Sequence, residues 1–116
     1  MLTNFDKGIK AEKVVAKFIS SAGFKIIQHR YVSPYGEIDL IAANKNLLLF
    51  CEVKSRSKCL HKEVLCNRQV KRITKSAEYF LMENPQYNNF NCRFDFVLLS
   101  EDKIIEYIQN AWEAYE

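Results

Sequence analysis

The spacing of apolar residues along the chain predicts two amphipathic helices. In residues 5–22 the apolar side chains fall within one broad sector at about 100° per residue, and Gly23 ends the helix. The opposite side carries Lys10, Lys13 and Lys17. A second helix is predicted over residues 67–83, and Asn84-Pro85 ends it. Its apolar stripe consists of Val70, Ile73, Ala77, Phe80 and Leu81.

Shorter apolar runs bounded by turn residues predict strands. The strands are expected at residues 24–31, 37–43, 47–54 and 92–99, with turns at Ser33–Gly36 and Asn44–Asn46. Residues 55–66 are polar and basic without a clear period and are predicted to form a loop. Residues 104–108 fit either a further short strand or the beginning of a last helix. The order α-β-β-β-α-β with a C-terminal extension predicts one α/β domain over residues 1–116, with a mixed sheet flanked by helices.

Composition places the chain among ordinary globular domains. It has 116 residues and is 48% hydrophobic, which is enough for one domain with a real core. No apolar run approaches the ~18 residues of a membrane span, and no signal-like stretch precedes the first charges, so we expect a cytoplasmic protein with no membrane partner. The four cysteines are therefore expected to be reduced. The spacing of Cys59, His61 and Cys66 matches no common zinc pattern, and we reject a zinc site.

Positive charge is concentrated in the middle of the chain. The net charge is only +3, but residues 54–75 contain eight basic residues against one acid, Glu63. One face of the second predicted helix carries Arg68, Lys71, Arg72 and Lys75. This face is either an ordinary solvated surface or a surface that contacts phosphates. Arg56 and Lys58, just beyond the strand at 47–54, are expected to touch a nucleic-acid strand.

The predicted hairpin carries charged side chains among its aliphatic residues: Glu37, Asp39, Glu52 and Lys54. A hairpin centred in the Asn44–Asn46 turn pairs positions whose numbers sum to 91, which places Asp39 opposite Glu52 and Glu37 opposite Lys54. Two carboxylates side by side repel each other unless a cation lies between them. The hairpin register therefore predicts a cation site.

Glu12 lies inside the apolar stripe of the first helix rather than at its border. It is either a buried glutamate paired with a core lysine or a backbone donor, or a carboxylate aimed at the sheet near Asp39 and Glu52. In the second interpretation, Glu12, Asp39 and Glu52 are ligands of Mg²⁺ or Mn²⁺, because hard divalent ions prefer oxygen ligands. Together with Lys54 they would form a catalytic group for metal-assisted phosphodiester cleavage.

A set of motifs spans nearly the whole chain: Gly8, Glu12, GEIDLIA (36–42), FCEVKSR (50–56), Lys71 with Arg72-Ile73, Ala77, RFDFV (93–97) and Asn110-Ala111. In these motifs the chain resembles the YraN-like family of uncharacterised bacterial proteins. Two positions depart from the family pattern: Ala11, where the family often has glycine, and Cys51, where valine is usual. Both residues are small and leave the chemistry unchanged.

The YraN-like family resembles in turn the PD-(D/E)xK nucleases, particularly archaeal Holliday-junction resolvases. The resemblance implies a restriction-endonuclease-like fold in which Asp39 is the first acidic position. Glu52 and Lys54 would be the (D/E)xK pair, and Glu12 the helical carboxylate. By analogy with the resolvases, a homodimer is also implied.

Three functions follow as expectations. The leading one is a DNA-binding, Mg²⁺-dependent endonuclease that acts on structured or branched DNA. The alternatives are a non-catalytic nucleic-acid-binding module with the same fold and a metal-stabilised structural subunit of a larger assembly. Outside the proposed site, Arg93 and Asp95 share one face of a central strand and are expected to form a structural pair.

Overall fold

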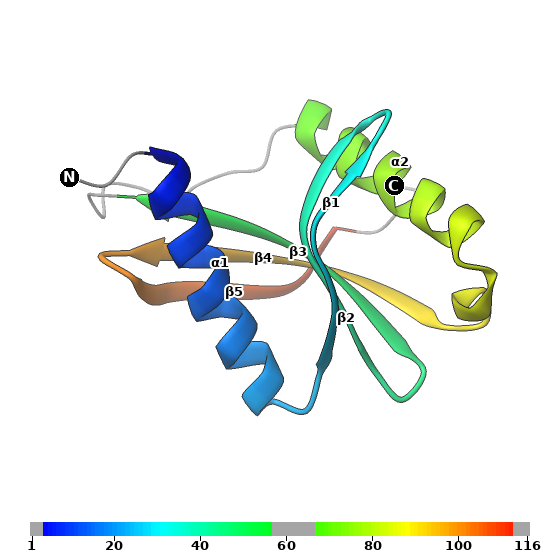
Figure 1. The fold of residues 1–116 in the computed structure, drawn as a ribbon, viewed down its shortest axis with the longest axis horizontal. Coiled ribbons are helices and arrows are strands. Elements are labelled where there is room, and N and C mark those ends of the chain that lie inside the picture. Colours follow the sequence, from blue (N-terminus) through cyan, green and yellow to red (C-terminus); the bar gives the residue numbers. More distant parts are fainter. Residues whose placement is uncertain (1–3, 57–66, 113–116) are drawn as a thin grey trace.

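The computed structural model describes residues 4–56 and 67–112, which form one five-stranded sheet with a helix on each face (Figure 1). The elements, in chain order, are α1 (Asn4–Ser21), β1 (Lys25–Ser33), β2 (Gly36–Asn44), β3 (Leu47–Arg56), α2 (Asn67–Glu83), a short 3₁₀ turn (Pro85–Tyr87), β4 (Asn91–Ser100) and β5 (Lys103–Trp112). The α/β architecture expected from the sequence is thus confirmed.

The sheet is mixed, and its strand order follows the chain: β1-β2-β3-β4-β5. Neighbouring strands are antiparallel except β3 and β4, which are parallel. Parallel strands need a crossover connection, and α2 lies between β3 and β4 in the chain to supply it. The first turns of α2 contact β3 at Glu52, to which Gln69 donates a hydrogen bond.

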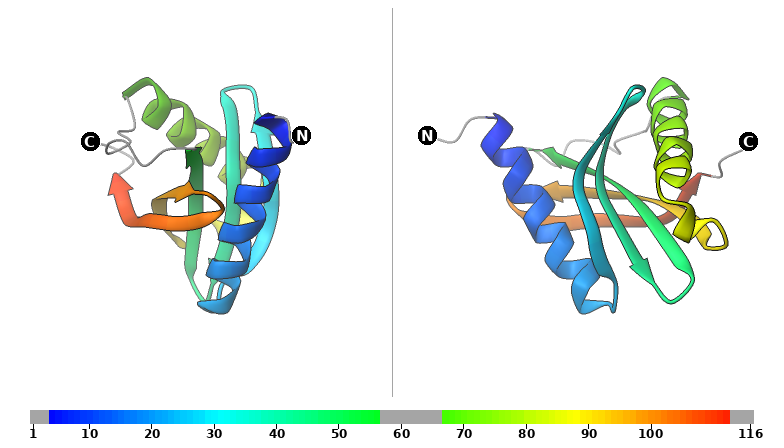
Figure 2. Two further views of the ribbon diagram at one scale, coloured as in Figure 1. Left: turned by 90° about the vertical axis from the view of Figure 1, so that its left-hand side faces the viewer. Right: turned by 45° about the vertical axis from the view of Figure 1, so that its right-hand side comes forward.

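The two helices pack on opposite faces of the sheet and create two hydrophobic cores (Figure 2). The core under α1 includes Ala11, Val15, Ile19, Leu40, Leu49 and Val97. The core under α2 includes Ile73, Ala77, Phe80, Ile41, Phe50 and Phe94. Residues 40 and 41 face opposite cores, as alternation along a strand requires. Because both faces are covered, the central strands are apolar along most of their length.

The observed elements agree closely with the predicted ones. Both helices begin and end within one residue of the prediction, and the 104–108 segment is part of a ten-residue strand rather than a helix. The loop predicted for residues 55–66 is wrong at residues 55–56, which continue β3 because their backbones pair with β4. The rest of the predicted loop, residues 57–66, lies outside the described residues. In the described part of the chain, no helix is long and apolar enough to cross a membrane.

Candidate metal and nucleic-acid site

The candidate site lies where β2 and β3 separate (Figure 1). Five pairs from Asn44↔Leu47 to Leu40↔Cys51 follow the register predicted for the hairpin, since their numbers sum to 91. The ladder ends at Leu40↔Cys51. The predicted pairing of Glu37 with Lys54 is therefore wrong: at Glu37, β2 pairs with β1 instead, opposite Val32.

The next pair in this register would be Asp39↔Glu52, but beyond Leu40↔Cys51 the side chain of Asp39, rather than its backbone, bonds to β3. Its Oδ2 accepts a hydrogen bond from the backbone N–H of Val53 at 2.7 Å. A buried backbone N–H needs an acceptor, and here a side-chain carboxylate supplies it after the ladder has ended. This bond fixes the Asp39 carboxylate against β3, beside residue 52.

Asp39 and Glu52 form a pair of carboxyl groups joined by a side-chain hydrogen bond. Burial, the charge of Asp39 and this hydrogen bond together raise the pKa of Glu52 to about 8, against the lowering effects of Lys54 and Gln69. Burial also raises the pKa of Asp39, although its bonds to Val53 and Glu52 oppose the shift. The two carboxyl groups therefore share a proton at neutral pH.

Lys54 and Gln69 complete the surroundings of this pair. Lys54, half-buried on β3, lowers the pKa of both carboxyl groups by its positive charge. Gln69, in the first turns of α2, donates from Nε2 to Glu52 Oε2 at 2.7 Å. Glu52 is thus held from two elements, β2 and α2.

Glu12 occupies the α1 side of the site and has an arginine partner. It is buried, and Arg30 Nε donates to its Oε1 at 3.0 Å. Burial and then the charge of Asp39 raise the pKa of Glu12 to about 7, although Arg30 lowers it. Both interpretations of Glu12 describe part of its surroundings. Its basic partner is Arg30 of β1 instead of a core lysine. It also lies near enough to Asp39 for the charge of Asp39 to raise its pKa.

Arg30 has an unusual backbone conformation that suits this contact. Its φ is +49°, in the left-handed region that non-glycine residues seldom adopt. The residue lies between the pairs His29↔Leu40 and Tyr31↔Ile38, at the position across from Asp39. The β1 strand thereby places a cation beside the acidic groups of α1 and β2.

These contacts divide the four predicted catalytic residues into two groups. Asp39, Glu52 and Lys54 lie together, whereas Glu12 is engaged by Arg30. Among residues 4–56 and 67–112, no three histidine, cysteine, aspartate or glutamate side chains gather closely enough to hold a metal ion between them. The structure therefore offers a two-carboxylate site with a third carboxylate nearby.

The predicted nucleic-acid-binding residues are only partly described. Four of them lie on α2 with exposed side chains: Arg68, Lys71, Arg72 and Lys75. Their helix contacts the sheet through the opposite stripe, so this basic face is open to solvent. Lys58 and the side chain of Arg56 lie outside the part of the chain that the structure describes.

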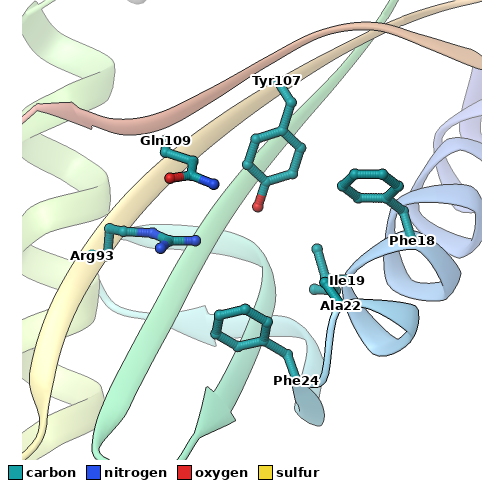
Figure 3. A pocket seen from close by; sticks show the side chains of 7 residues that line it. All are labelled: Phe18, Ile19, Ala22, Phe24, Arg93, Tyr107 and Gln109. Carbon is teal, nitrogen blue, oxygen red and sulfur yellow. The ribbon is translucent and has the colours of Figure 1, made fainter.

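A separate cavity lies on the α1 face of the sheet. Its volume is about 420 Å³, and the residues around it are Phe18, Ile19, Ala22, Phe24, Arg93, Tyr107 and Gln109 (Figure 3). None of the predicted catalytic residues lines it.

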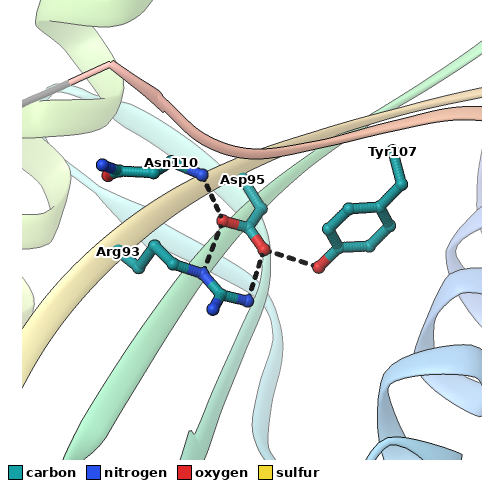
Figure 4. A network of polar contacts seen from close by, with 4 residues as sticks. All are labelled: Arg93, Asp95, Tyr107 and Asn110. Atoms are coloured by element: carbon teal, nitrogen blue, oxygen red, sulfur yellow. Dashed lines mark hydrogen bonds and ion pairs between the residues drawn. The ribbon is translucent and has the colours of Figure 1, made fainter.

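Beneath this cavity is the expected Arg93–Asp95 pair (Figure 4). The Nε and Nη2 atoms of Arg93 both donate to the fully buried Asp95 carboxylate at 2.9 Å. The same carboxylate also accepts from the Tyr107 hydroxyl at 2.6 Å and from the Asn110 backbone N–H at 2.9 Å. A buried charge with this many donors is structurally satisfied, so the prediction of a structural pair is confirmed.

Comparison with known proteins assigns the chain to a family. A family model described as "Uncharacterised protein family UPF0102" matches residues 11–99. The chain belongs to this family. It is similar to the UPF0102 protein of Francisella tularensis strain SCHU S4, with 39% identity over 109 residues that cover 90% of this chain and 92% of the relative. The UPF0102 protein of Rhodopseudomonas palustris strain BisB18 is 38% identical over 111 residues, covering 95% and 82%.

The part of the chain that matches UPF0102 contains the whole candidate site. It includes Glu12, the Asp39–Glu52 pair, Lys54 and the basic face of α2, and it ends before β5. The resemblance inferred from the sequence motifs is thus confirmed at the level of the family.

Two residues of the site, Gln69 and Arg30, were not found by sequence reasoning. Gln69 lies four positions before the buried Ile73, on the same side of the helix. The helical period therefore indicates a polar side chain facing the sheet, as it does for Glu12. Arg30 gave no such signal, because its contact with α1 depends on a left-handed backbone that no sequence pattern indicates.

Proposed function

We propose that this UPF0102 protein is a DNA-binding, metal-dependent endonuclease that hydrolyses phosphodiester bonds in structured or branched DNA. The observation that carries the proposal is the pair of half-buried carboxyl groups, Asp39 and Glu52, held side by side with raised pKa values. Keeping two acidic groups together in a half-buried place costs free energy in the absence of a cation. Such a cost is typical of a functional site.

The residues present fit Mg²⁺ or Mn²⁺. Mg²⁺ is usually held by one or two carboxylates while it keeps several waters, and Asp39 and Glu52 supply two. When bound, such an ion polarises a phosphate group and lowers the pKa of its water. Glu12 would contribute a third carboxylate only after its bond with Arg30 is released.

The chain's own groups would orient the substrate and balance its charge. The Val53 N–H and the Gln69 amide hold the two carboxyl groups in place. The positive charge of Lys54 acts on both carboxyl groups, and its ammonium would neutralise negative charge that builds on the phosphate in the transition state. Positioned donors of this kind act without reorganisation during the reaction.

The basic face of α2 supports DNA as the substrate. Its arginine and lysine side chains are exposed. They belong to the same helix as Gln69, which donates a hydrogen bond to Glu52. Phosphate contacts by such residues position a nucleic acid without reading its sequence. We therefore expect recognition of DNA shape, with little sequence preference.

A non-catalytic nucleic-acid-binding module is the alternative. The observation that favours it is the Arg30–Glu12 ion pair, which neutralises the third carboxylate and, within the described residues, leaves only two for a metal. In this case the same basic face would bind DNA, and the carboxyl pair would not act on it.

A cleavage assay on labelled junctions, flaps, duplexes and single strands, with Mg²⁺ or Mn²⁺, separates the two functions. Wild type should cut at least one branched substrate, and Asp39→Asn and Glu52→Gln should abolish cutting. Glu78→Gln is a matched control, because Glu78 is an exposed carboxylate on α2. DNA binding without cleavage of any substrate would establish the non-catalytic module instead.

A further inference from the structure

The tip of the β1–β2 hairpin presents an aromatic ring to solvent beside α2. Tyr35 is 48% exposed, and its ring centre lies 6.4 Å from that of Tyr79 in an edge-to-face arrangement. The Nζ atom of Lys75 lies 5.7 Å from the centre of the Tyr35 ring. Both Figure 1 and Figure 2 show the hairpin tip next to α2, and these contacts place it against the middle of the helix.

The hairpin tip is anchored to the helix by buried polar contacts. The hydroxyl oxygens of Ser33 and Ser76 lie 2.8 Å apart, and the backbone N–H of Tyr35 donates to Ser33 Oγ at 3.0 Å. Gly36, with a φ of +141°, brings the backbone close to Arg72: a Cβ atom built at Gly36 would lie 3.9 Å from Arg72 Cβ. The tyrosine is thus held before any ligand binds, which lowers the entropic cost of binding.

The charges around the ring indicate the chemistry of its ligand. From Arg68 to Lys75, α2 carries four exposed cations, and its first acidic residue is Glu78. An exposed aromatic ring among lysine and arginine side chains is the combination that binds single-stranded nucleic acid, because bases stack on the ring while the cations contact phosphates. An exposed apolar ring that served only a protein partner would not need this surrounding positive charge.

We propose that Tyr35 is a stacking site for an unpaired nucleobase, and that DNA with single-stranded character is the preferred ligand of this surface. Bases inside a duplex already stack on their neighbours and offer the ring no free face. The inference deepens the proposed DNA-binding function and rests on it. It also adds a residue that distinguishes branched or single-stranded DNA from uninterrupted duplex.

The stacking site and the carboxyl pair are close enough to share one DNA molecule. Gln69, which holds Glu52, precedes Lys75 by six residues, or about 9 Å along the helix axis. Stacked nucleotides are about 3.4 Å apart along one strand, so this length of helix spans roughly three nucleotides.

Binding of labelled single-stranded and duplex oligonucleotides of equal length, measured by fluorescence anisotropy in EDTA, tests the inference. Tyr35→Ala should raise the Kd for the single strand by roughly 5- to 150-fold, the range that base stacking on an aromatic ring gives, and should change the Kd for duplex far less. Tyr35→Phe, which keeps the ring, should bind like wild type. Val32→Ala is the control, because Val32 is 67% exposed on the same hairpin and offers no ring.

Salt dependence provides a second measurement that separates stacking from charge. Tyr35→Ala should leave the slope of log Kd against log salt concentration unchanged, whereas Lys75→Ala should reduce it by about one unit if Lys75 contacts a phosphate. The inference is overturned if Tyr35→Ala binds single strands like Val32→Ala, or if it weakens duplex binding equally.

The outcome also distinguishes this inference from the proposed function. If wild type binds neither oligonucleotide, both fail. If binding is strong but independent of Tyr35, only the stacking site fails. Tyr35-dependent binding by a protein that cuts no substrate would support the stacking site and overturn the nuclease.

Discussion

Replacing Glu52 with glutamine should stabilise the metal-free protein at alkaline pH. The pKa of Glu52 is about 8 in the folded protein against an ordinary value of 4.5, so the folded state keeps a proton that the unfolded chain releases between these values. The contribution of Glu52 to stability is therefore fully present below the unfolded pKa and is lost as the pH rises through the folded pKa. Glutamine does not titrate, and the variant should escape this loss.

The magnitude follows from the size of the pKa shift. One pKa unit corresponds to about 1.4 kcal/mol, so raising the pKa of Glu52 from 4.5 to about 8 makes wild type lose roughly 3–4 kcal/mol between pH 5 and pH 8. Glutamine can accept from Gln69 through its carbonyl and donate to Asp39 through its amide, as protonated Glu52 does. The variant should therefore match wild type at pH 5 and exceed its free energy of unfolding by roughly 3 kcal/mol at pH 8.

Urea unfolding followed by circular dichroism, in EDTA at both pH values, measures this difference. Glu78→Gln, at an exposed position on α2, should stay within about 0.5 kcal/mol of wild type throughout. Added Mg²⁺ should stabilise wild type more than Glu52→Gln, because the variant lacks one anionic ligand. The reasoning is refuted if Glu52→Gln is destabilised at pH 8, or if its difference from wild type is the same at both pH values.

Three further predictions concern charge at the site and its surroundings. Lys54→Ala should leave DNA affinity nearly unchanged in anisotropy titrations while removing any cleavage seen on gels, because the ammonium is needed where charge builds in the transition state. Replacing Arg56, Lys71 and Arg72 together by alanine should flatten the salt dependence of DNA binding by about one unit for each phosphate that these side chains neutralise; an unchanged slope would exclude such a role. Arg30→Ala should lower the free energy of unfolding by about 1–3 kcal/mol at pH 8 and by less at pH 5. The reason is that Glu12, with its pKa of about 7, is charged at pH 8 and would lose its ion-pair partner; equal losses at both pH values would contradict this.

Local sequence patterns were enough to predict most of the secondary structure. Each helix is indicated by the 3.6-residue period of the side that faces the sheet, and each strand by a short apolar run. The polar Asn44–Asn46 turn also fixed the β2–β3 register correctly, because in a hairpin the turn decides which residues face each other. The same patterns marked Glu12 and Asp39 as polar groups in apolar surroundings.

The tertiary structure decided which groups those buried polar residues meet. The β2–β3 ladder ends at Leu40, so Asp39 bonds to the Val53 backbone, and Glu37 does not face Lys54. Likewise, the residues after Glu101 form a strand because β4 offers them a free edge, although their own sequence fits a helix equally well.

Partners from distant elements could not be predicted, for a physical reason. A periodic pattern records only whether a side chain faces the core, which is a property of its own element. Whether Arg30 reaches Glu12, or Gln69 reaches Glu52, depends on how β1 and α2 pack against the rest of the sheet. The sequence by itself determined the elements and the acidic residues of the site; packing between elements decided that two carboxylates share a proton while the third is held by an arginine.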